Sequence, residues 1–233
     1  MISEAVGYLK GSDDAVTTVI LGAVMTLFAF LIVPLFAAMG YMVRVLDRTA
    51  RGDGEPPVFE DWGELIVDGA KATAIAFVYA LIPTAVLVAF VVSGGLLGAS
   101  GSDLLGTIGG IGIFVGFVVW LALTLAVAYA VPAALANFAE TRRLGAGFDW
   151  ATMRRALADR AYATGWLTAF VIVVAGGVVG GLLNAVPVIG FIASAFVGFY
   201  TAVAAYYVIG HTWGELRHTP VTERPVVDGQ PGI

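Results

Sequence analysis

Long stretches without a charged residue constrain this chain more than any other feature of its sequence. Four runs, of 29, 31, 36 and 54 residues, contain no Asp, Glu, Lys or Arg; they are 15–43, 72–102, 104–139 and 161–214. A helix of about 20 residues crosses the hydrocarbon core of a bilayer, and only 12% of the chain is charged, roughly half the share in soluble domains. The sequence therefore predicts an all-α fold, a polytopic transmembrane helix bundle.

The lengths of these runs predict five transmembrane helices. Two crossings need about 40 residues, so each of the first three runs holds one helix and the fourth holds two, joined at Asn184–Pro187. The first helix is expected to tilt, and the third is either one long helix or a helix with a turn at Pro132. Proline removes a backbone donor and bends or ends a helix. The expected kinks are Pro34, Pro83, Pro132 and Pro187.

Basic residues alternate between the connections. Arg44, Arg48, Arg51 and Lys71 follow the first helix and five arginines follow the third, whereas none follows the second or the fourth. We expect the protein in the plasma membrane. By the positive-inside rule, the two long loops and the C-terminus are predicted to be cytoplasmic and the N-terminus to be on the outer side. The segment 1–14 holds one lysine and three acids and resists translocation little, so a sixth crossing is the competing topology. The tail 219–233 is expected to be flexible.

The two long loops repeat one order of features: a proline in the preceding helix, basic residues, a phenylalanine and then Asp-Trp. The two sets are Pro34, Phe59, Asp61, Trp62 and Pro132, Phe148, Asp149, Trp150. We interpret them as parallel repeats of about 15–98 and 106–183, each a helix, an amphipathic segment and a helix, followed by a fifth helix at about 188–214.

Each amphipathic segment is expected to lie in the membrane surface before the chain turns inward. Asp61 and Glu64 have the spacing of a capping box, and Asp68 is expected on the polar side of its segment, opposite Leu65 and Gly69. The aromatic and acidic residues of the two sets are candidates for interfacial anchoring or for docking a partner. They are Phe59, Asp61, Trp62, Phe148, Asp149 and Trp150.

Glycines are spaced for close packing of helices. The small-xxx-small spacing lets two helix backbones approach, within one chain or between chains. The pairs with this spacing are Gly112 and Gly116, Gly176 and Gly180, and Gly177 and Gly181.

Little in the sequence points to chemistry. The runs lack the ionisable residues that pumps and intramembrane enzymes use, and His211 and His218 lack the spacing of a metal site. The net charge of −5 gives no basic footprint for nucleic acid. We therefore expect no enzyme activity, no catalytic, cofactor or metal site, and no nucleic-acid partner. Convergence of His211, Asp68 and Asp149 in one pocket would revive the enzyme hypothesis.

Several of these motifs together resemble a known family. Ser12-Asp13-Asp14-Ala15, Val33-Pro34, the run Arg44 to Arg51, Glu55-Pro56-Pro57-Val58-Phe59, Asp61-Trp62 and Gly69 are similar to an archaeal membrane family, domain of unknown function 4013. The end of the last helix, Tyr206–Gly210, is similar to that of haloarchaeal members, and the likeness covers nearly the whole chain. The resemblance implies a multi-helix membrane protein of salt-loving archaea without an assigned activity.

Two functional hypotheses remain. The first is a non-enzymatic integral membrane protein that acts as a scaffold, an assembly component or a membrane-organising component. Its partners would be membrane lipids and other membrane proteins or further copies of itself. The alternative is a small-molecule or lipid transporter, or an accessory subunit of one, which requires a polar-lined cavity near mid-membrane between helices broken by proline.

Overall fold

A computed structural model describes residues 2–11 and 14–218, and every regular element in this part of the chain is a helix. In order they are α1 (Ile2–Gly7), the 3₁₀ helix η1 (Tyr8–Gly11), α2 (Ala15–Leu27), α3 (Ile32–Ala50), α4 (Trp62–Gly98), α5 (Asp103–Thr141), the 3₁₀ helix η2 (Leu144–Phe148), α6 (Trp150–Leu157), α7 (Arg160–Leu183) and α8 (Ile189–His218). Helices α4, α5, α7 and α8 are long and apolar enough to cross a membrane, and α2 is a shorter apolar helix. The predicted helical membrane bundle is confirmed; the predicted flexible tail lies outside the described residues.

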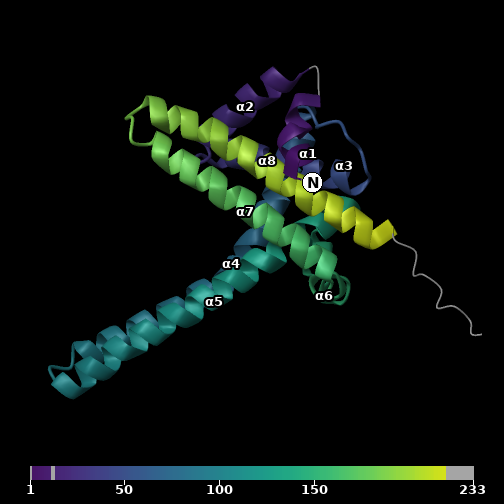
Figure 1. The fold of residues 1–233 in the computed structure, drawn as a ribbon. Helices are drawn as coiled ribbons and strands as arrows, with labels where there is room; N and C mark the ends of the chain where they lie inside the picture. Colours follow the sequence, from purple (N-terminus) through teal and green to yellow (C-terminus); the bar gives the residue numbers. More distant parts are fainter. Residues whose placement is uncertain (1, 12–13, 219–233) are drawn as a thin grey trace, which may run out of the picture.

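Two antiparallel hairpins dominate the shape of the molecule (Figure 1). Helices α4 and α5 form one hairpin and α7 and α8 form the other, and the two project in different directions from a common base. The base holds the C-terminal ends of α3, α5 and α8, the N-terminal ends of α4 and α7, and also η2 and α6. We call this base the polar end, because both long charged connections lie there.

The first uncharged run forms two helices instead of the single tilted helix that we predicted. Helix α2 ends at Leu27, a bend follows, and α3 begins at Ile32 with Pro34 in its first turn. A proline ring clashes with the carbonyl group four residues earlier and has no N–H group to donate to it, so a proline inside a helix kinks or breaks it, and here the helix breaks before Pro34. In the first turn of a helix, by contrast, a missing N–H group costs nothing. The break therefore lies one turn before Pro34 and lets the chain reverse.

This reversal brings the N-terminal segment to the polar end. Thr26, just before the break, lies beside Gly198 in the first half of α8, and α3 then returns along α8 to the polar end. The hydroxyl group of Tyr8 donates a 3.0 Å hydrogen bond to the carbonyl oxygen of Glu55, in the loop after α3. The five-helix prediction placed the N-terminus at the end opposite the loops. That placement is wrong, because α2 and α3 form a short hairpin that reaches only part of the way along α8.

The two predicted surface segments fold differently from one another. Trp62 begins α4, which continues without a break to Gly98, so the first segment does not turn. A helix of 37 residues is about 55 Å long and exceeds a hydrocarbon core of about 30 Å, so α4 is longer than one crossing needs. In the second loop α6 is a separate helix, and Asp159 caps the following α7. Only the second loop therefore contains a separate short helix before the next long helix.

The buried core lies where α3, α4, α5, α7 and α8 meet at the polar end. Two glycines let α3 and α4 touch there: a Cβ atom on Gly40 would lie 1.9 Å from the carbonyl oxygen of Leu65. A Cβ atom on Gly69 would lie 1.7 Å from the carbonyl oxygen of Phe36. Fully buried side chains of this core include Leu46, Ile75, Leu135, Tyr162 and Trp213. Exposed apolar side chains cover the outer parts of both hairpins, among them Phe77, Leu96, Phe114, Val178 and Leu182.

Candidate functional site

A dense set of charges joins three helices at the polar end. Arg142 caps the C-terminus of α5 with a left-handed backbone, φ 56°, and its guanidinium group donates to Oδ2 of Asp68 on α4. It also donates over 3.0 Å to Oδ2 of Asp47 on α3. Both aspartates are buried, and their other carboxylate oxygens pair with Lys71 at 3.5 Å and Arg51 at 2.7 Å. Each buried carboxylate is thus shared by two cations, and we call these five residues the Arg142 cluster.

The Arg142 cluster holds the three helices together. Burial alone would lower the pKa of Arg142, but hydrogen bonds and charges from Asp47 and Asp68 outweigh burial and raise that pKa above its ordinary value. The sequence analysis placed Asp68 on the polar side of its segment, whereas the structure buries it beside Leu65. The missed signal is a single acid within the apolar stripe of a helix, because such an acid is stable only with a partner.

Trp213 separates two shallow cavities at the polar end. Its indole N–H group donates over 3.1 Å to Oε2 of Glu140, and Oε1 of the same carboxylate pairs with Arg217 at 3.1 Å. One cavity of about 200 Å³ lies between α6 and α8 and is lined in part by Arg155 and Asp159. The other lies between α3, α5 and α8. Two further cavities, beside the first loop and beside the end of α3, are also lined by residues of the polar end.

The first predicted anchor set lies in a loop that Arg44 holds in place. The guanidinium group of Arg44 donates to the carbonyl oxygens of three loop residues at 2.8 to 3.4 Å, Asp61 among them. The ring of Phe59 stacks between Tyr41, with 4.5 Å between ring centroids, and Trp62, with 5.8 Å. Trp62 is 41% exposed. Asp61 has a left-handed backbone, φ 47°, and makes no side-chain cap, so the predicted capping box is wrong.

The second anchor set surrounds the start of α6. The carboxylate of Asp149 accepts hydrogen bonds from the N–H groups of Ala151 and Thr152 and, at 2.7 Å, from the Thr152 hydroxyl group. The hydrogen bond from Thr152 holds the pKa of Asp149 below its usual value. Phe148 stacks on Tyr79, and Trp150 is 61% exposed. This set presents an outward tryptophan beside a well-formed helix cap.

Only some of the predicted packing glycines lie against a neighbouring helix. A Cβ atom on Gly116 would collide with Phe90 of α4, and one on Gly176 would collide with Thr201 of α8, so these two glycines pack their own hairpins. Gly180 lies in ordinary contact distance of Ser194. At the remaining glycines, a Cβ atom would have no atom of a neighbouring element within 4 Å; they are Gly112, Gly177 and Gly181.

The prolines also differ in their surroundings. Pro83 and Pro132 lie inside the continuous helices α4 and α5, so the third run forms one long helix. Pro187 lies in the turn between α7 and α8, and Pro34 in the first turn of α3. Of the two predicted alternatives for the third run, one long helix is thus correct, and no turn interrupts it at Pro132.

The three residues whose convergence would suggest an enzyme have separate partners. Asp68 binds Arg142, Asp149 caps α6, and Nε2 of His211 lies 3.3 Å from a carboxylate oxygen of Glu215. Within residues 2–11 and 14–218, no three His, Asp or Glu side chains are grouped as a metal site would need.

Comparison with known proteins gives the family. A model described as "protein of unknown function (DUF4013)" matches residues 23–185, which is more than half of the chain. The chain belongs to this family. The DUF4013 match contains both long loops and all five residues of the Arg142 cluster, and it confirms the resemblance to this family over those residues. No curated protein and no solved structure matches the chain.

Proposed function

We propose that this DUF4013 protein is a non-enzymatic membrane-organising scaffold, which packs its helical hairpins against those of further copies or of other membrane proteins. One observation carries the proposal: the two hairpins diverge, and their outward faces bear glycines without neighbours (Figure 1). Gly112 on α5 and Gly177 on α7 are two of them. Membrane helices associate through such small residues, because lipid provides no hydrophobic force between them. These faces fit a helix that a single copy does not supply.

The proposed topology has four crossings of the plasma membrane, with both termini in the cytoplasm. The arginines of both long loops lie at the polar end, and the positive-inside rule assigns that end to the cytoplasm. Helix α2, with 13 residues, is about 20 Å long, too short for a core of about 30 Å. Because Tyr8 binds the loop at Glu55, the N-terminus belongs to the same side. The α2–α3 hairpin therefore enters and leaves on the cytoplasmic side.

The absence of cysteine makes the scaffold proposal directly testable. We compare two single-cysteine variants of α7, Gly177→Cys on the outward face and Ala169→Cys on the buried face. In intact membranes, a short thiol cross-linker should give discrete protein adducts from Gly177→Cys and almost none from Ala169→Cys. Equal, weak cross-linking at both positions would show that only lipid covers the outward face and would overturn the proposal.

The transport alternative has no comparable support. It required a polar-lined cavity near mid-membrane, whereas the four cavities described above lie at the polar end. The two buried acids, Asp47 and Asp68, are engaged by Arg142, which favours a structural role for them. We therefore propose the scaffold alone.

A further inference from the structure

The first loop presents an excess of exposed negative charge. Residues 51–64 contain one arginine and five acids. Arg51 is paired with Asp47, and Asp53 lies 3.8 Å from Arg48. Arg51 and Asp53 therefore belong to ion pairs within the chain. Four exposed carboxylates remain, and none of them forms an ion pair with another residue of the described chain. We call these four residues the acidic edge: Glu55, Glu60, Asp61 and Glu64.

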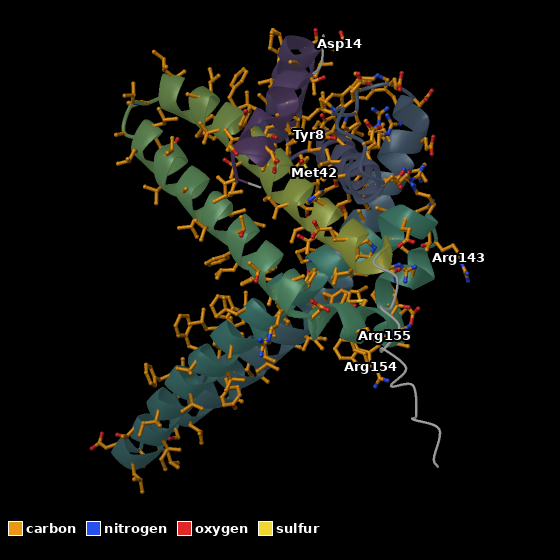
Figure 2. All side chains as sticks on the ribbon, turned by 45° about the vertical axis from the view of Figure 1, so that its right-hand side comes forward. Tyr8, Asp14, Met42, Arg143, Arg154 and Arg155 are labelled. Carbon is orange, nitrogen blue, oxygen red and sulfur yellow. The ribbon has the colours of Figure 1, made fainter. Side chains whose placement is uncertain are left out.

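The second loop presents an excess of exposed positive charge. Residues 143–160 contain four arginines and two acids, and both acids cap helices: Asp149 caps α6 and Asp159 caps α7. All four arginines are exposed, and no carboxylate of residues 2–11 or 14–218 lies in salt-bridge distance of them. Figure 2 shows three of them on the same side of the molecule, directed away from the ribbon. We call the four the basic edge: Arg143, Arg154, Arg155 and Arg160.

The two edges lie apart within one molecule. In Figure 1 the loop that carries the acidic edge is above the C-terminal part of α8, whereas α6, which carries Arg154 and Arg155, is below it. One copy therefore leaves both edges exposed to solvent, although Arg44, Arg48 and Arg142 line the same hollow as Glu60, Asp61 and Glu64. A second copy at the same depth in the membrane offers each edge its opposite. A contact between unlike surfaces leaves one free edge on each partner, so it continues into a row or closes into a ring.

Each edge also has an apolar anchor. Trp62 adjoins Asp61 and is 41% exposed, and Trp150 lies one turn before Arg154 and is 61% exposed. Tryptophan and arginine dominate the energetics of many protein interfaces, and arginine also stacks on indole rings. A contact between the edges would bring the tryptophan of each copy next to charges of the other.

A bilayer of anionic lipids fits this surface less well than a second copy does. Anionic headgroups attract the basic edge but repel the acidic edge at the same level of the membrane. Their attraction also extends over the Debye length, about 10 Å at 0.1 M salt, and weakens as salt rises. Ion pairs in direct contact at an interface are screened much less. Complementary charge on the two edges therefore favours a second copy of the chain.

We infer that copies associate head to tail in the plane of the membrane, the acidic edge of one against the basic edge of the next. This inference rests on the proposed scaffold function and names one of its partners. It makes the protein a self-assembling unit whose polar ends align the copies, while the divergent hairpins stay available for helix packing. The pairing uses unlike surfaces, which gives it a distinctive response to charge reversal.

The test uses the full chain in liposomes of zwitterionic phosphatidylcholine, with donor and acceptor dyes on an introduced Ser100→Cys at the outer turn of the α4–α5 hairpin. One variant, R143E/R154E/R155E, leaves one arginine and three acids at the second loop and therefore has two acidic edges. The other, E55R/E60R/E64R, leaves Asp61 and three arginines at the first loop and therefore has two basic edges. Like-charge contacts are strongly unfavourable, so each variant alone should associate at least about tenfold more weakly than the parent. Mixed in equal amounts, the two should recover energy transfer to within about threefold of the parent, because every contact is again between opposite charges.

The outcomes that overturn the inference are equally defined. Circular dichroism first establishes that both variants keep the helical content of the parent. Undiminished transfer in either variant alone, or no recovery in the mixture, would refute the head-to-tail contact. Transfer in the parent that appears only when phosphatidylglycerol is added would assign the basic edge to lipid and refute it as well. Cross-linking at Gly177→Cys that persists after such a failure would leave the scaffold proposal intact, so the two can fail separately.

Discussion

Replacing Arg142 by alanine tests whether its cluster stabilises the fold. The change leaves Asp47 and Asp68 buried, each with one cation instead of two. A buried ion pair that loses one partner costs about 3–5 kcal/mol, and a hydrogen bond to a charged group contributes about 1.5–3 kcal/mol. The Arg142 side chain is 33% exposed, and Lys71 and Arg51 remain in place. We therefore expect a loss of about 2–3 kcal/mol in the free energy of unfolding, less than for a buried pair that loses its only partner.

The assay is reversible unfolding in mixed micelles as the fraction of sodium dodecyl sulfate rises, followed by tryptophan fluorescence and circular dichroism. Arg143→Ala is the matched control, because Arg143 is adjacent, exposed and outside the cluster. Its substitution should change the free energy of unfolding by no more than about 0.5 kcal/mol. Equal effects of the two substitutions, or a loss below about 0.5 kcal/mol for Arg142→Ala, would refute the stabilising role. A triple variant with Asp47→Asn, Asp68→Asn and Arg142→Met should be less destabilised than Arg142→Ala, since no buried charge is left alone.

Three further predictions concern single positions. Asp149 has a lowered pKa in the folded chain. Its cap on α6 therefore stabilises the fold fully above the unfolded pKa of about 3.9, and this stabilisation is lost as pH falls through the folded pKa. The amide-exchange protection factors of α6 should fall in that pH window, and in Asp149→Ala they should be independent of pH. In cells whose exterior is treated with an impermeant maleimide, Gly101→Cys should react and Ser3→Cys should not, and the reverse would refute the four-crossing topology. Gly40→Ala should lower the free energy of unfolding by about 1–3 kcal/mol, because its methyl group meets the backbone of α4, whereas Gly95→Ala, in open space, should cost nothing in the same denaturation assay.

The sequence predicted the parts of the fold that composition and local signals determine. The uncharged runs located the four long helices, and the turn at Asn184–Pro187 separates α7 from α8 as expected. A separate helix, α6, begins directly after Asp149, at the second Asp-Trp motif. Each of these features depends on residues within a few positions of one another, so a single sequence is enough to reveal it.

The missed features depend on length ambiguities or on distant pairs. A run of 29 residues is too long for one crossing and too short for two, so its length did not distinguish a tilted helix from a hairpin with a bend before Pro34. The segment from Trp62 to Lys71, which was predicted to be separate, is the first part of α4. A change from charged to apolar residues does not by itself end a helix. The partners of Arg142 lie 74 and 95 positions away in the chain, and no local pattern connects them.

The distribution of contacts separates stability from assembly. At the polar end, buried side chains, close glycine contacts and the Arg142 cluster join the helices of one copy. Toward the outer turns, α4 and α5 contact mainly each other, and lipid supplies no hydrophobic force that would bring the two hairpins together. Substitutions inside the polar end should therefore change the free energy of unfolding. Substitutions of outward glycines such as Gly112 should change association and leave unfolding unaltered, because in one copy a Cβ atom at these positions would meet no atom of a neighbouring helix.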